Sequence, residues 1–259
     1  MIAICRKVKL SPFFLLIIFI SFLSGLFYDV LSFLFVIIMH EIGHIITSLI
    51  FKWKVKRVDI TLCGGFITYD DVIDKPFKEE FLVSISGFLA QGILFIILFI
   101  LNKMYVIDNS SFFMINKYSL AIFLFNLLPI YPLDGSKILS VILNVLMPYK
   151  RSLKCLFYVS LLIIILIVIT ILSKDVKIEA SYVIIFSFII KKLISLYKDI
   201  PYLFNRLLFE RYIYYYPDIN KYNYINGKNL SLFKRRRKNY FYINGHYHSE
   251  RSILKERFD

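Results

Sequence analysis

Three ionisable side chains, those of His40, Glu41 and His44, lie close together in an otherwise apolar stretch of the sequence. Residues four apart on an α-helix lie one turn apart on the same face, so both imidazoles can bind one Zn²⁺ ion. Glu41 would then lie beside the metal. Zinc lowers the pKa of a bound water to about 7, and a carboxylate can accept its proton and pass it to the leaving amine. The motif therefore predicts metal-assisted peptide hydrolysis.

The alternative interpretation of this motif is a chance match, or two core histidines that are satisfied by hydrogen bonds. With 4 His and 7 Glu in 259 residues, random placement produces the pattern in roughly 0.2% of such chains. The motif lies within residues 31–51, which contain no other charge, and ionisable groups in a span are functional by default. Metal binding is therefore favoured.

A third ligand is needed, because catalytic zinc sites usually keep three protein ligands and leave one position open. Asp134 is the best candidate, since it follows an apolar stretch that Pro129 and Pro132 interrupt. Irregular backbone at membrane depth must be buried in protein or line a wet cavity. The other interpretation of Asp134 is a helix N-cap. His246 and His248 lie in a polar tail and are predicted to be solvated.

The elements that position these residues are predicted to be membrane helices. The chain is 58% hydrophobic and 18% aromatic, which is too apolar for an ordinary soluble domain. We therefore expect an all-α polytopic membrane protein of about six transmembrane helices. The predicted spans are residues 12–28, 30–51, 79–101, 112–130, 153–172 and 178–196.

The distribution of basic residues predicts the topology. The net charge is +14, and with the N-terminus inside, 28 of the 32 Lys and Arg residues fall in cytoplasmic segments. Cytoplasmic loops of membrane proteins carry such an excess. Both termini are therefore expected in the cytoplasm. No nucleic-acid partner is needed to explain the charge.

Two segments depart from the helical pattern. Residues 52–74 alternate roughly and contain Gly64-Gly65, which predicts a small β-hairpin at the membrane edge. Its exposed edge could capture a peptide by strand addition, or the hairpin could be an ordinary surface feature. Residues 197–259 are rich in tyrosine and contain the basic run Lys234–Lys238. This cytoplasmic tail is predicted to attract anionic lipid or to be simply solvated.

Taken together, the two motifs resemble the site-2 protease family of intramembrane zinc metalloproteases. The resemblance rests on His40-Glu41-Ile42-Gly43-His44 and on the later Asn126 and Pro132-Leu133-Asp134-Gly135, and it covers about residues 1–200. It implies a six-span protease domain at residues 1–196, followed by the tail at 197–259. It also implies one zinc ion held by His40, His44 and Asp134, with Glu41 as the general base.

The same resemblance implies a role for Asn126 near the substrate. Its amide could hold the substrate carbonyl or the developing oxyanion, or could merely bond a neighbouring helix. The layout is most similar to family members that act in sporulation. This similarity implies a sigma-factor precursor as the membrane-associated substrate and inhibitory membrane proteins as partners. It also implies a location in the bacterial cell membrane or in the mother-cell membrane around the forespore.

Two departures from the family pattern matter. Residues 84–91 lack the Gly-Pro pair of many relatives, but Ser84, Ser86, Gly87 and Ala90 can still allow close helix packing. Residues 197–259 are too short for the nucleotide-sensing CBS domain of some relatives.

Other function classes fit the sequence less well. A metal transporter or sensor would need further ionisable groups along a path through the spans, and only Glu79, Glu80 and Glu179, at the ends of predicted spans, are available. An inactive scaffold would more naturally have lost Glu41 or Asp134.

Overall fold

The computed structural model describes residues 8–10, 19–61, 64–69, 73–173, 180–214, 216 and 218–259. Most of these residues are helical, and they include two small three-stranded sheets. The chain divides into two compact units. The first, here the N-terminal unit, contains residues 1–71 and 82–127, and the second, the C-terminal unit, contains residues 72–81 and 128–259. Each unit is described by itself.

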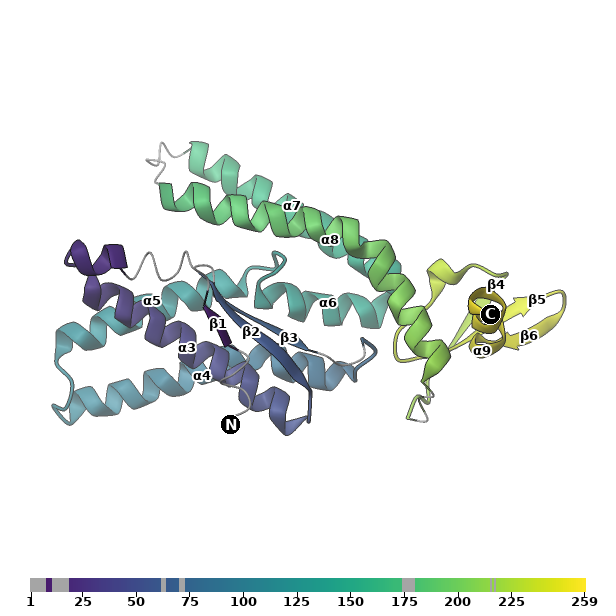
Figure 1. Ribbon diagram of the computed structural model, residues 1–259, viewed down its shortest axis with the longest axis horizontal. Helices are drawn as coiled ribbons and strands as arrows, with labels where there is room; N and C mark the ends of the chain where they lie inside the picture. The colour runs from purple at the N-terminus through teal and green to yellow at the C-terminus, as the bar shows by residue number, and fades with distance from the viewer. Residues whose placement is uncertain are drawn as a thin grey trace. The chain divides into compact units, whose positions relative to one another are not determined.

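The N-terminal unit is built on three long helices (Figure 1). Their buried faces form a shared apolar core. Tyr118 also donates a hydrogen bond to Asp29 Oδ1 at 2.6 Å, which ties the third helix to the first. The helices are α3 (Phe27–Ile50), α4 (Phe77–Lys103) and α5 (Asn109–Leu127), and the core residues are Val36, Ile37, Leu94, Leu98 and Ile122.

Small residues allow α3 and α4 to cross at close range. A Cβ atom built at Gly43 would lie 2.5 Å from the Ser86 carbonyl oxygen and 2.7 Å from the Ala90 Cβ. Any side chain larger than hydrogen would therefore push the two backbones apart. The expected close packing of the third predicted span is confirmed, and α4 brings its polar residues directly against α3.

The predicted hairpin is present. Strands β2 (Val55–Thr61) and β3 (Gly64–Tyr69) pair antiparallel. A third strand, β1 (Val8–Leu10), adds to β2 in parallel, which the sequence pattern does not predict. The Ser48 hydroxyl on α3 and the Tyr69 hydroxyl on β3 share a hydrogen bond at 2.7 Å, so the hairpin is fixed to the same helix that contains the motif.

In the C-terminal unit, α7 and α8 run side by side, with α6 preceding them in the chain (Figure 1). The irregular stretch before α6 is partly buried, with Ile130 at 1% and Leu133 at 4% exposure, which agrees with the rule that irregular backbone at membrane depth is enclosed by protein or lines a cavity. Its Tyr131 N–H is satisfied by Ser160 Oγ of α7 at 3.1 Å. The helices are α6 (Asp134–Leu146), α7 (Tyr149–Ser173) and α8 (Ala180–Ile213).

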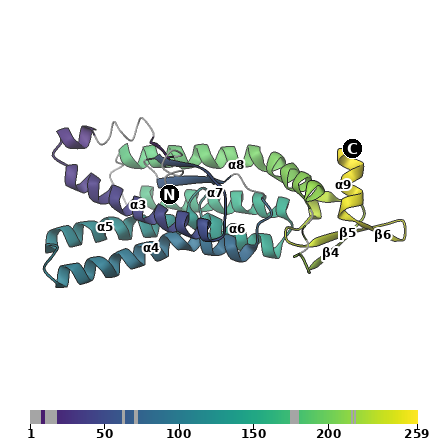
Figure 2. The same ribbon diagram turned by 60° about the horizontal axis from the view of Figure 1, so that its bottom comes forward.

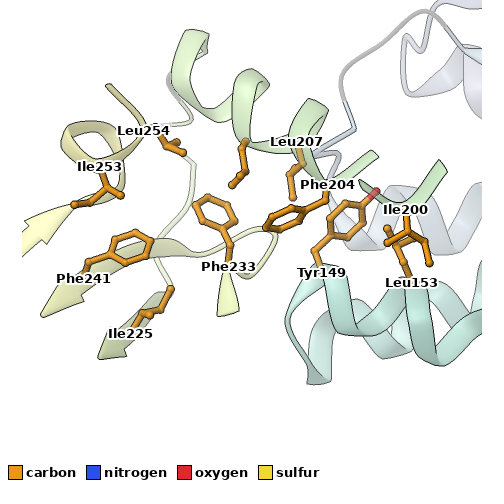
Figure 3. Packing of buried hydrophobic residues seen from close by; sticks show 11 residues of the cluster. Tyr149, Leu153, Ile200, Phe204, Leu207, Ile225, Phe233, Phe241, Ile253 and Leu254 are labelled. Carbon is orange, nitrogen blue, oxygen red and sulfur yellow. The ribbon is translucent and has the colours of Figure 1, made fainter. Parts of the chain in front are cut away.

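Residues 218–259, here called the C-terminal domain, fold into a small sheet and a helix at the end of α8 (Figure 2). Strand β4 pairs with β5 in parallel and β5 with β6 antiparallel. Phe233 and Phe241 are fully buried and point into a core shared with α7 and α8 (Figure 3). The elements are β4 (Tyr222–Asn226), the short 3₁₀ helix η1 (Leu230–Leu232), β5 (Lys238–Ile243), β6 (His246–Ser249) and α9 (Glu250–Phe258).

The predicted spans compare with the helices as follows. Among the described residues, α3, α4 and α7 are long and apolar enough to cross a membrane. Helices α5 and α8 also form where spans were predicted, and α8 continues without interruption through residue 197, where the tail is predicted to begin. Of the predicted span at 12–28, residues 12–18 lie outside the described residues, residues 19–23 are helical, and a turn at Ser24 and Gly25 precedes α3. Six crossings therefore stay a prediction.

Candidate metal centre

The two histidines of the motif point at one another from successive turns of α3. His40 and His44 are 2% and 3% exposed. Their Nε2 atoms lie 3.1 Å apart, as their spacing of four residues predicts. Two nitrogen atoms, one from each imidazole, thus converge on the same point in the interior.

The other nitrogen of each ring is held by a partner on α4. His44 Nδ1 donates to the Val83 carbonyl oxygen at 2.6 Å and lies 3.3 Å from Ser86 Oγ. His40 Nδ1 donates to Gln91 Oε1 at 3.2 Å. Because a carbonyl oxygen can only accept, Nδ1 carries a proton in both rings, and in the neutral form of each ring the lone pair sits on Nε2.

This arrangement fits a metal ion. Two facing lone pairs at hydrogen-bond distance repel unless something between them carries positive charge. A tetrahedral site with bonds of about 2.0–2.1 Å places two ligand nitrogens about 3.3 Å apart, which is close to the observed 3.1 Å. Partners that fix the tautomer of metal-binding histidines are the usual companions of such sites. The donor chemistry of His40 and His44 therefore suits zinc.

Both imidazoles pack directly against Gly87 of α4. A Cβ atom at this position would lie 2.5 Å from His40 Cε1 and 2.5 Å from His44 Nε2. The rings could not keep their orientation against such an atom. Glycine is therefore required at position 87 by the space that the two histidines occupy.

Glu41 is also buried, at 8% exposure, although it carries an ionisable group. On α3 it lies three residues before His44, so the two side chains share one side of the helix. Carboxylates are almost never this buried without a partner or a function. Its placement agrees with the predicted general base, whose role stays a prediction.

Asp134 belongs to the C-terminal unit, where it is the first residue of α6 and 5% exposed. Leu133 occupies the N-cap position and no side-chain cap bond is present, so the N-cap interpretation is wrong. Asp134 Oδ1 accepts from Lys137 Nζ at 2.7 Å. Its carboxylate is of a type that could complete a zinc site of two imidazoles, and its part as the third ligand stays a prediction.

The remaining predicted residues lie elsewhere. Asn126 is half-buried in the last turn of α5, and its role near the substrate stays a prediction. His246 and His248 are exposed on β6, as expected. Gln91, which contacts His40, is not among the predicted site residues, although a glutamine inside an apolar span is the kind of signal that could identify it.

The basic run of the tail is not uniformly exposed, contrary to what its sequence suggests. Arg235 has a side chain that is only 5% exposed and pairs with Glu80 and Asp74. Burial by itself would lower the pKa of this guanidinium, but the carboxylates of Glu80 and Asp74 outweigh it and raise that pKa above its ordinary value. One of the five cations is therefore withdrawn from any lipid surface.

The chain is similar to several known proteins. It is 31% identical over 206 residues to stage IV sporulation protein FB of Bacillus subtilis, covering 80% of this chain and 71% of that protein. It is 28% identical over 121 residues to a zinc metalloprotease of Methanocaldococcus jannaschii, covering 46% of this chain and 35% of that one. No family model matches the chain.

The fold also has a solved counterpart. The structure is similar to the site-2 protease from Methanocaldococcus jannaschii with a TM-score of 0.55 and 20% identity, over 73% of this chain and 89% of that one. At 20% sequence identity, this similarity is evidence for the fold alone. It agrees with the helical architecture.

Proposed function

Because the chain belongs to the site-2 protease family of intramembrane zinc metalloproteases, we propose that it cleaves a membrane-associated protein near the cytoplasmic face of a bacterial membrane. Membership makes it a zinc metalloprotease, and the transporter or sensor interpretation is set aside. The observation that carries the proposed site is the pair of Nε2 atoms at 3.1 Å, each with its ring oriented from Nδ1.

In the proposed site, His40, His44 and Asp134 hold one zinc ion. A zinc ion bound there would supply a Lewis acid that makes a water nucleophilic at neutral pH. Glu41 accepts the proton of that water and delivers it to the leaving amine. Val83 and Gln91 keep the imidazoles in the tautomer that exposes Nε2. Asn126 holds the substrate carbonyl.

The proposed substrate class is supported by the similarity to the relative in Bacillus subtilis, whose name places that protein in sporulation. A sigma-factor precursor is the proposed substrate, and inhibitory membrane proteins are the proposed regulators. The protease domain spans residues 1–196 with six crossings and both termini in the cytoplasm. The four partly exposed cations of the basic run, at positions 234 and 236–238, attract anionic lipid. These assignments rest on the resemblance and on the distribution of charge.

The test is the substitution Glu41→Gln in full-length protein purified in detergent. Loss of the general base is expected to lower kcat by about 10²- to 10⁴-fold, while one zinc per chain remains. Cleavage of a membrane-tethered precursor and metal content are measured on the same samples. Glu256→Gln is the matched control, because Glu256 makes the same chemical change on the exposed face of α9.

Two outcomes would contradict the proposal. Cleavage unaffected by Glu41→Gln would remove the general base from its role. Absence of stoichiometric zinc from the wild-type protein would remove the metal site itself.

A further inference from the structure

Arg235 reaches from the C-terminal domain to the beginning of α4. Its Nη1 donates to Glu80 Oε2 at 3.3 Å, and its Nη2 donates to Glu80 Oε1 and to the Ile73 carbonyl oxygen. Glu80 lies in the first turn of α4. The guanidinium thus binds both the Glu80 carboxylate on α4 and the backbone that precedes this helix.

A second buried arginine reinforces the same connection. Arg211 of α8 has a side chain that is 1% exposed and donates to Asp74 Oδ2 at 3.1 Å and to Glu250 Oε1 at 2.6 Å. Asp74 in turn accepts from the Arg236 backbone N–H at 3.2 Å. Residues 73–80 are therefore fixed to α8 and to the C-terminal domain by charged groups that are shielded from water.

The helix that begins at this connection supplies the acceptors of the metal centre. Val83 lies three residues after Glu80 on α4, and its carbonyl oxygen accepts from His44 Nδ1. Gly87 and Gln91 follow on the next two turns and contact His40. A shift or rotation of the first turn of α4 would be carried along the helix to these groups, because a helix moves as a rigid element over so few turns.

From these contacts we infer that Arg235 is a positioning residue of the protease, which acts through Glu80 and α4 on the orientation of the two metal-binding histidines. This inference rests on the proposed function. It assigns to the C-terminal domain a part in the geometry of the active site, and it gives a residue of the basic run a role that is independent of lipid.

The experiment compares Arg235→Met with Arg251→Met in the full-length protein. Arg251 is exposed on α9, so each variant loses one positive charge from the C-terminal domain. Arg251→Met therefore shows the effect of losing one charge from the C-terminal domain, including any loss of attraction to lipid. Three quantities are measured: the rate of zinc release to a chelator, kcat and KM for a membrane-tethered substrate, and hydrogen exchange of residues 83–91.

For Arg235→Met we expect about 10- to 100-fold faster zinc release and a similar fall in kcat, with KM little changed and faster exchange in α4. Arg251→Met should match the wild type. Glu80→Gln is the second variant, and it leaves Arg235 paired with Asp74. Its effects and those of Arg235→Met should be strongly non-additive in the double variant, because both break the same interaction.

The inference is overturned if Arg235→Met behaves like Arg251→Met, or if the effects of Arg235→Met and Glu80→Gln simply add. Hydrogen exchange in β5 shows whether Arg235→Met unfolds the C-terminal domain. If it does, Glu80→Gln becomes the test, and the inference is overturned if this variant releases zinc at the rate of the wild type. Failure of the wild type to cleave any substrate would count against the proposed function alone, since zinc release and exchange still report on Arg235.

Discussion

At the scale of single residues, the metal centre depends as much on what orients the imidazoles as on the imidazoles themselves. Each ring has one nitrogen directed at the other ring and one held by α4. Residues that hold metal-binding histidines in this way commonly change metal affinity 10- to 100-fold when they are replaced. The motif identifies the proposed ligands, and contacts with α4 determine which nitrogen of each ring is available.

Gly87 gives a test of this view. In Gly87→Ala, the added Cβ would meet both imidazoles, so the rings must move and overpacking should cost about 1–3 kcal/mol. We expect zinc affinity to fall at least ten-fold, measured by competition with a chelator, and kcat to fall with it.

The control for this substitution is Gly92→Ala, because a Cβ at Gly92 meets no atom within 4 Å and lies on the same helix. It should leave zinc affinity unchanged. Equal zinc affinity in Gly87→Ala and Gly92→Ala would mean that the packing at Gly87 does not constrain the site.

At the scale of elements, α3 is held on two sides. Its close crossing with α4 is set by Gly43, and its far end is held by the hairpin through Ser48 and Tyr69. The indole of Trp53 packs against the Tyr69 ring at 5.1 Å between centroids. The hairpin is therefore attached to the helix that contains the motif. Such an attachment is needed if the hairpin edge is to bind a peptide by strand addition.

The substitution Tyr69→Phe tests this attachment. It removes the hydroxyl that bonds Ser48, so we expect about 1 kcal/mol less stabilisation of the hairpin and faster amide exchange in β3. Tyr105→Phe is the control, since Tyr105 is 96% exposed. Unchanged exchange in β3 would show that the hydroxyl pair does not hold the hairpin.

At the scale of the whole molecule, residues 218–259 are a folded domain and not a solvated tail. Their core includes Tyr149 and Leu153 of α7 as well as Phe204 and Leu207 of α8. The beginning of a membrane-length helix is thus packed into the same core as β5 and α9. Loss of this core should loosen the helices that it contacts.

Phe241→Ala measures that coupling. Phe241 is fully buried, and removing a buried phenylalanine side chain commonly costs about 3–5 kcal/mol. We expect loss of exchange protection in β5, α9 and the first turns of α7. The control is Tyr224→Ala on the exposed face of β4, where Tyr224 is 66% exposed and the expected cost is about 0.5 kcal/mol. If α7 kept its exchange protection in Phe241→Ala, the stability of this helix would not depend on the C-terminal domain.

Much of the local structure follows from the sequence, because local patterns specify it. Apolar blocks predict the helices of the spans, the break at Pro129 and Pro132 ends α5, and Gly64-Gly65 marks the hairpin. The parallel pairing of β1 with β2 and of β4 with β5 was missed. Parallel pairing joins strands without a tight turn, so it leaves no local sequence signal.

By itself, the sequence determined the chemistry of this protein, because spacing on one helix fixes which side chains share a face: His40 and His44 one turn apart, with Glu41 between them. Only the tertiary structure decided the tautomer of each imidazole and the pairing of Arg235 with Glu80. The partners of His44, His40 and Arg235 lie 39, 51 and 155 residues away in the chain. No local pattern encodes contacts at such separations, since they arise only when helices pack and exclude water.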